Sequence, residues 1–315
     1  MCKTILAVLL MVLAGNLWGQ TTPGGSALGT RLAAIAAQHH GQVALFAENL
    51  KTHETVALSP DLVVQTASVI KLAILYEALE QIRAGKAHFE DRIAVGPDDL
   101  VGGSGLLQFF DTPLSLTLKD VLTMMIVMSD NSAANLAMDK VGIANVDARM
   151  ASLGLKNTYL YKKVSKPVPP GETMPSDQKR FGLGKTTARE MAALMTKLAT
   201  CDLGGPVQPA DAPLCTAAQK MLQKQFYRAT IPRYLDGSPG ATGDSIASKT
   251  GSLDAVRNDV AAISTKNGMV VIACFTVDNQ DHSWGYNQEG EGTIAKLARE
   301  IVTTWSPQGL APWPK

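Results

Sequence analysis

The sequence predicts an α+β protein in which helices flank an antiparallel sheet and an all-helical domain is inserted into the chain. Strand-like patterns lie near both ends of the sequence, whereas helical periodicity dominates the middle. A Lys-Asn-Gly turn at residues 266–268 joins two apolar strand-like segments, which makes them antiparallel neighbours. We therefore expect a discontinuous α/β domain of residues 28–60 and 206–310, interrupted by an all-α domain of residues 61–205.

The length and composition fit a folded protein of about two domains. The chain has 315 residues, of which 46% are hydrophobic, and a net charge of +1. An apolar fraction of this size can form a sizeable core, which excludes a disordered chain. The near-neutral charge and the scattered Lys and Arg residues argue against nucleic acid as a partner.

The first 20 residues are predicted to form a secretory signal peptide. Lys3 precedes an apolar run over residues 5–14, and small or polar residues follow, which is the order found in such signals. A membrane anchor is the alternative, although the run is short for a membrane span. We expect the mature chain to be exported to the periplasm or secreted, and to contain no membrane span.

Local patterns predict the elements of the N-terminal part in turn. Residues 28–38 have Ala and Leu at helical spacing, and the strand-like segments 42–48 and 55–58 are close enough to form a hairpin. Apolar residues recur at helical spacing over residues 68–84, and a glycine follows directly. This part therefore supplies one helix and two strands of the sheet, followed by a long helix.

The middle of the chain is predicted to contain further helices and one long loop. The predicted helices cover residues 118–128, 132–141, 146–153 and 188–198. Thr187 and Glu190 have the spacing of a capping box at the start of the last of these helices. Residues 164–184 are rich in Pro and Gly, so we expect an irregular loop there, and loops of this length are usually functional.

The C-terminal part is predicted to complete the sheet. Its elements are a helix over residues 216–226, strands over 245–249, 259–265 and 269–277, and a last helix over 291–304. Because strands precede and follow the helical middle, the two ends of the chain are expected to meet in one sheet.

Three cysteines remain after the predicted signal peptide, so at least one is unpaired. Cys201 and Cys215 flank a Gly- and Pro-rich loop that could bring them together as a disulfide. Cys274 lies inside an apolar run, where a buried free thiol is expected. No cluster of Cys and His has zinc-site spacing, and we expect neither a metal nor an organic cofactor.

Ser68 and Lys71 form the first motif that could carry chemistry. They lie at positions i and i+3 of one predicted helix, so their side chains share a face. Burial lowers the pKa of a lysine, which can then take the proton of a serine hydroxyl and make it a nucleophile. The spacing alone is common, because Ser176 and Lys179 repeat it in the long loop, where we expect them to be solvated. A helix N-cap is the simpler role for Ser68 taken alone.

The second motif is Ser129-Asp130-Asn131, which lies between two predicted helices. In a tight loop the first and third side chains can point the same way, while Asp130 turns back to hold the loop. Capping of the following helix is the alternative, and both roles can hold together.

The third motif covers residues 249–252, Lys-Thr-Gly-Ser, at the end of a predicted strand. Its lysine supplies a positive charge, Thr250 and Ser252 supply hydroxyls, and Gly251 allows the backbone to approach a ligand closely. A surface turn is the alternative. The three motifs in this order are a strong signal, whereas the Ser-x-x-Lys pair alone is weak.

With these motifs, residues 30–305 resemble a class A serine β-lactamase or a close homologue. The resemblance implies a three-layer α/β/α sandwich with an inserted all-α domain, and a site between the two domains. It also implies an acyl-enzyme mechanism. Ser68 attacks the lactam carbonyl, Lys71 transfers protons, and Ser129 passes a proton to the leaving nitrogen.

The resemblance also implies which residues bind the substrate. Asn131 contacts the side-chain amide of the substrate, the segment 249–252 holds its carboxylate through Lys249 and Thr250, and the backbone N–H groups of Ser68 and Ser252 form the oxyanion hole. Arg257 falls where related sequences place a second carboxylate anchor, with a surface arginine as the alternative.

One part of the family pattern is missing. The loop sequence E-x-x-L-N, which supplies the deacylating glutamate in the family, does not occur between residues 164 and 186. Glu172 has near-family spacing and is the candidate base, although an exposed loop carboxylate is the alternative. Without such a base the acyl-enzyme would form but hydrolyse slowly.

The resemblance therefore implies a β-lactamase whose partner is a small-molecule β-lactam, and we expect a monomer. The alternatives are a penicillin-binding protein or D-Ala-D-Ala peptidase that turns over slowly, and a non-catalytic module that binds a cell-wall fragment.

Overall fold

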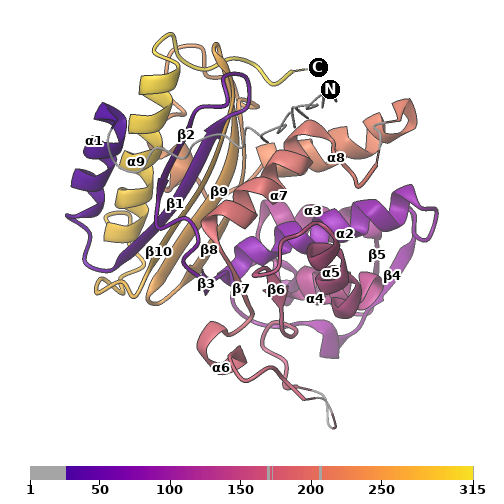
Figure 1. Ribbon diagram of the computed structural model, residues 1–315. Coiled ribbons are helices and arrows are strands. Elements are labelled where there is room, and N and C mark those ends of the chain that lie inside the picture. Colours follow the sequence, from indigo (N-terminus) through magenta and orange to yellow (C-terminus); the bar gives the residue numbers. More distant parts are fainter. Residues whose placement is uncertain (1–25, 169–170, 172, 206–207, 315) are drawn as a thin grey trace, which may run out of the picture.

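The computed structural model describes residues 26–168, 171, 173–205 and 208–314. A central sheet packed between helices forms one half of the molecule, and a mainly helical lobe forms the other (Figure 1). The predicted signal peptide lies outside the described residues, so export stays a prediction. Within the described residues, no helix is long and apolar enough to cross a membrane.

The central sheet has five antiparallel strands in the order β2-β1-β10-β9-β8. The strands are β1 (Gln42–Asn49), β2 (Thr55–Leu58), β8 (Ile246–Leu253), β9 (Val256–Thr265) and β10 (Gly268–Val277). Strands β1 and β10 pair along eight residues, although more than 200 residues separate them in sequence. The two ends of the chain thus share one sheet, as predicted.

Two helical layers cover this sheet, which completes the expected three-layer sandwich (Figure 1). Helices α1 (Ala27–Ala36) and α9 (Glu289–Trp305) pack on one face. Helices α7 (Ala188–Thr200) and α8 (Ala212–Gln223) lie on the other face, towards the helical lobe. Along β9, side chains alternate between the two cores, as the period of two in a strand requires. The fold class predicted from the sequence is therefore confirmed.

The helical lobe is built around helix α2 (Lys71–Arg83), which follows a short 3₁₀ turn, η1 (Ala67–Ile70). The first ten residues of α2 are all buried, including Lys71. Helices α3 (Leu118–Val127), α4 (Asn131–Val141) and α5 (Ile143–Ser152) surround it. The helix that follows the predicted nucleophile is thus the most enclosed element of the lobe.

The inserted region is not entirely helical, in contrast to the prediction. It contains two small sheets, β4-β5 and β3-β7-β6. Their strands are β3 (Val64–Gln65), β4 (Arg92–Val95), β5 (Leu114–Thr117), β6 (Tyr159–Leu160) and β7 (Gly184–Thr186). The region also contains the short helices η2 (Pro97–Asp99), η3 (Leu107–Phe109) and α6 (Gln178–Phe181). Two more short helices, η4 (Pro209–Asp211) and η5 (Ile231–Tyr234), follow it in the chain. Strands of two to four residues are too short for an alternating pattern to be recognised.

The predicted bounds of two strands were too short. Strand β8 continues to Leu253 instead of ending at Lys249, and β9 begins at Val256 rather than Asp259. All ten residues of β9 are buried, because both faces of the sheet are covered. Polar residues near these strand ends, such as Lys249 and Arg257, are buried rather than exposed to solvent. Their polarity is the reason that the sequence suggested shorter strands and, as an alternative, a surface turn. The surface-turn alternative for residues 249–252 is therefore wrong.

A disulfide joins Cys201, at the C-terminal cap of α7, to Cys215 in α8. The Cα atoms of the pair are 5.5 Å apart, within the usual range for a disulfide. Cys274 in β10 is buried, and burial raises the pKa of its thiol.

Candidate active site

Ser68 lies in the turn η1, directly before the buried helix α2. The preceding residue, Ala67, has a φ of 44°, in the left-handed region that non-glycine residues seldom adopt. Ser68 is half-buried, and within the described part of the chain no side-chain capping bond is made at this helix start, so the N-cap alternative does not apply. The strained backbone of Ala67 and the start of the helix together place Ser68 at the N-terminal end of α2.

Lys71 is completely buried one turn after Ser68, and its ammonium group binds the second motif. Its Nζ atom donates to Ser129 O at 2.6 Å, to Ser129 Oγ at 3.3 Å and to Asn131 Oδ1 at 3.0 Å. Burial lowers the pKa of Lys71 to about 7, and the negative charge of Asp130 acts in the opposite direction. A lysine with this pKa is present in both protonation states near neutral pH, as proton transfer requires.

The second motif forms the junction between α3 and α4, with Ser129 in the left-handed region at a φ of 52°. Asp130 caps α4, because its side chain accepts a hydrogen bond from Ala133 N at 2.9 Å. Its other oxygen accepts from Leu106 N and Leu107 N at 2.7 and 2.8 Å. The capping role proposed from the sequence is real, and it fixes the loop that orients Ser129.

Lys249, in strand β8, reaches the same serine from the opposite side. Its Nζ atom donates to Ser129 Oγ at 2.9 Å and to Thr250 O at 2.8 Å. Burial and the neighbouring Lys71 ammonium both lower the pKa of Lys249. The structure thus brings Lys71, Ser129, Asn131 and Lys249 into one hydrogen-bonded cluster between the sheet and the helical lobe.

The end of strand β8 packs directly against the turn that carries Ser68. A Cβ atom placed on Gly251 would lie 2.8 Å from Ser68 N and 2.9 Å from Thr66 O, which is closer than real side chains approach. Gly251 is therefore needed for this contact, as its type suggested. Ser252 follows it in β8, so its backbone lies next to the same turn.

A buried carboxylate beneath Thr250 is a feature that the sequence analysis missed. Asp259 of β9 pairs with Thr250 across the sheet and accepts hydrogen bonds from Thr230 Oγ1 at 2.6 Å and Ile231 N at 3.1 Å. Burial raises the pKa of Asp259 to about 6. An isolated Asp carries no sequence signal for such a position, because only the pairing of β8 with β9 brings it below the motif.

Arg257 lies outside this cluster, because its hydrogen bonds within the described part of the chain go to other residues. It is fully buried, and its guanidinium donates to Leu253 O, to Val256 O at 2.9 Å and to Ser283 O at 2.6 Å. The ring of Trp284 lies 4.4 Å from the guanidinium carbon. These contacts hold the turn after β8, and they contradict the surface-arginine alternative. A role for Arg257 as a carboxylate anchor stays a prediction.

The long loop is bound to helix α4 at Val164. Asn135 lies one helical turn after Asn131 in α4, and its side chain binds both Val164 N at 2.8 Å and Val164 O at 3.0 Å. The candidate base Glu172 lies outside the described residues. Asp177, the other carboxylate of the loop, accepts hydrogen bonds from Tyr161 Oη at 2.7 Å and from Lys185 Nζ at 2.6 Å. The loop residue that Asn135 fixes, one helical turn along α4 from Asn131, is therefore apolar.

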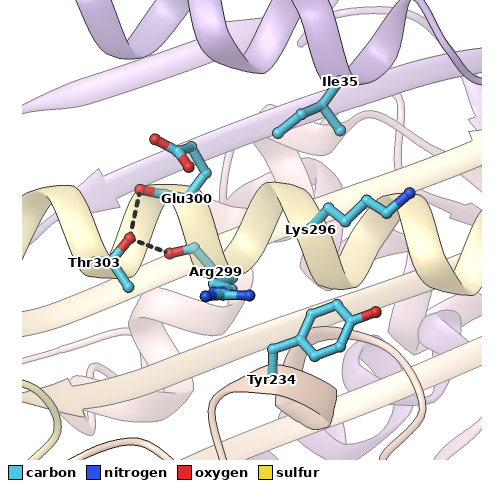
Figure 2. Close-up of a pocket in the computed structure, with 6 residues that line it drawn as sticks. All are labelled: Ile35, Tyr234, Lys296, Arg299, Glu300 and Thr303. Atoms are coloured by element: carbon cyan, nitrogen blue, oxygen red, sulfur yellow. Dashed lines mark hydrogen bonds between the residues drawn. The ribbon is translucent and has the colours of Figure 1, made fainter.

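Two other features of the structure are not part of the candidate site. The second Ser-x-x-Lys pair, Ser176 and Lys179, is exposed, as expected. Figure 2 shows a pocket of about 570 Å³ on the outer face of α9, lined by residues including Tyr234, Lys296 and Arg299. Neither contains a residue of the three-motif cluster. Among the described residues, no group of His, Cys, Asp and Glu could hold a metal ion.

Several known proteins are similar to this chain. A β-lactamase from Sphaerobacter thermophilus is 30% identical, with a TM-score of 0.73 over 88% of this chain and 96% of that one. A point mutant of PBP-A, solved as an acyl-enzyme complex with penicillin G, is 21% identical, with a TM-score of 0.72 over 88% and 95%. At the latter identity the likeness concerns the fold alone.

A shorter similarity connects the chain to a curated protein, the β-lactamase regulatory protein BlaB of Streptomyces cacaoi. The two are 28% identical over 111 residues, which is 35% of each protein, so the match spans about a third of that relative. The model of the beta-lactamase enzyme family, in contrast, matches residues 27–305 and includes every residue of the cluster. The chain therefore belongs to the beta-lactamase enzyme family.

Proposed function

We propose that the chain is a serine hydrolase that opens β-lactam rings through an acyl-enzyme on Ser68. The observation that carries this proposal is the Ser129 hydroxyl held between two buried lysines, Lys71 and Lys249. A proton can pass along such a chain of hydrogen bonds without reaching bulk water. Proton transfer to the leaving nitrogen is the step that an amide needs and an ester does not.

The acylation step uses three members of the cluster, namely Lys71, Ser129 and Lys249. Neutral Lys71 takes the proton of Ser68, whose oxygen bonds to the lactam carbonyl carbon. The N–H groups of Ser68 and Ser252 stabilise the oxyanion. As the carbon–nitrogen bond breaks, Ser129 gives its proton to the nitrogen and recovers one from Lys71. The ring opens without loss of atoms, and Lys249 and Thr250 bind the substrate carboxylate.

A second candidate is a penicillin-binding protein that acylates rapidly and deacylates slowly. The contact between Asn135 and Val164 favours this candidate, because the loop residue bound to α4 one helical turn from Asn131 is apolar and cannot act as a base. Hydrolysis of the acyl-enzyme needs a base within about 3 Å of the attacking water. PBP-A, which shares the fold, was captured as an acyl-enzyme with penicillin G in a point-mutant form.

Nitrocefin turnover by the purified mature chain tests the proposed hydrolase. Steady-state hydrolysis that is lost in Ser68→Ala supports it. Covalent labelling by penicillin G without steady-state turnover supports the second candidate. Absence of both turnover and labelling would leave only a non-catalytic binding module.

A further inference from the structure

Asn258 binds the backbone immediately before the predicted nucleophile. Its side chain projects from β9 on the face of the sheet that carries Lys249 and Gly251. The Nδ2 atom donates to Gln65 O at 2.9 Å and to Thr66 O at 3.0 Å. Two carbonyl acceptors require the amide nitrogen on that side, so the orientation of the group follows from chemistry.

The segment that Asn258 binds is under backbone strain. Thr66 precedes Ala67, whose φ of 44° costs free energy and persists only because neighbouring contacts impose it. The strand partner of Asn258 is Gly251, which lies against the same turn. Two adjacent strands therefore contact the turn. In β9 the Asn258 amide binds its backbone, and in β8 Gly251 allows the strand to pack closely against it.

Burial makes this contact specific. Asn258 is 1% exposed, and its Oδ1 atom has no hydrogen-bond partner among the described residues. A buried amide that satisfies only its donors carries a desolvation cost that an apolar residue would avoid. The hydrogen bonds to Gln65 O and Thr66 O offset this desolvation cost, and an apolar residue could not make them.

We propose that Asn258 is a positioning residue for acylation, because it fixes the turn that sets the location of Ser68 Oγ relative to Lys71. This inference rests on the proposed function. A displacement of about 1 Å at a reacting atom can reduce a rate by about 100-fold. Asn258 acts through the backbone of residues 65 and 66 and has no contact with the substrate in this proposal.

The test is pre-steady-state acylation by nitrocefin in Asn258→Asp, a substitution of nearly equal volume. The carboxylate would face two carbonyl oxygens and release the turn. We expect the acylation rate constant to fall by about 10- to 100-fold, with the dissociation constant of the initial complex within about twofold of wild type. Asn258→Ser, which removes the amide without adding a charge, carries the same expectation and replaces the first variant if that one does not fold.

The matched control is Asn279→Asp, since Asn279 is equally buried but binds His39 and Thr276 on the opposite face of the sheet. A variant that is only less stable would label a smaller fraction of the protein at an unchanged rate. Wild-type acylation rates in both Asn258 variants would overturn the inference. Absence of labelling in the wild type would instead overturn the proposed function.

Discussion

Lys71 and Lys249 donate hydrogen bonds to the same acceptor, the hydroxyl oxygen of Ser129, at 3.3 and 2.9 Å. Both lysines are fully buried, and the pKa of each is lowered mainly by burial. Two ammonium groups that share one acceptor repel each other. The loss of one proton therefore lowers both the desolvation cost of the pair and the repulsion between its charges. The pair is thereby suited to accept a proton during acylation.

The acylation rate constant is expected to rise with pH and to reach half its maximum near pH 7. The pKa of Lys71 is lowered to about 7, and only its neutral form can take the proton of Ser68. Stopped-flow acylation with nitrocefin across neutral pH, on both sides of this pKa, measures the constant separately from binding. The separation matters because loss of the Lys249 charge at higher pH weakens binding of the substrate carboxylate.

Lys71→Arg should lower the same rate constant by at least about 100-fold and abolish its pH dependence, since arginine stays protonated. Lys179→Arg, in the exposed Ser-x-x-Lys pair, is the control and should change neither. A flat pH profile in the wild type would exclude Lys71 as the base.

Val164→Glu is expected to accelerate deacylation by about 100-fold, because it places a carboxylate where Asn135 holds the loop against α4. If the second candidate is correct, the wild type accumulates acyl-enzyme with penicillin G, which intact-mass spectrometry detects over time. Val164→Gln has a similar shape without a base and should deacylate at the wild-type rate.

Glu172→Gln examines the other candidate base. If Glu172 is the base, nitrocefin turnover should fall by at least about 100-fold in this variant while acylation stays rapid. Unchanged turnover would exclude Glu172 as the base.

Arg257→Met should destabilise the protein by about 2 kcal/mol, because it removes the hydrogen bonds of a buried guanidinium and leaves the buried Val256 O without this donor. Urea unfolding measures this change. If Arg257 instead anchors the substrate carboxylate, the dissociation constant for nitrocefin will rise while stability stays within about 0.5 kcal/mol of wild type.

Replacement of both Cys201 and Cys215 by serine should lower the stability by about 3 kcal/mol, because the disulfide closes a loop with a sequence separation of 14. Non-reducing peptide mapping of the wild type should recover this pair and a free Cys274. A disulfide that includes Cys274 would refute the pairing.

The local motifs of the site could be predicted from the sequence, whereas its long-range contacts could not. Ser68 and Lys71 are separated by one helical turn, so their proximity is a property of the sequence alone. The contact of Asn258 with residues 65 and 66 exists only because β9 lies beside the nucleophile turn. The fold class was similarly accessible, but the pairing of β1 with β10 was not specified by any local pattern.

Polar residues in buried strands explain the remaining differences. The polar residues Arg257 and Asn258 suggested a strand start at Asp259, yet all three residues are buried inside β9. The left-handed conformations of Ala67 and Ser129 also have no sequence signature, because neither residue is a glycine. Tertiary contacts impose these features on the chain.

The most direct test of the account is to map the covalent product formed with penicillin G. The protein should gain the mass of the intact antibiotic, because ring opening loses no atoms, and the added mass should lie on the peptide that contains Ser68. Ser68→Ala should gain none. Label on the Ser176 peptide, or equal labelling of Ser68→Ala, would contradict the assignment of Ser68 as the nucleophile.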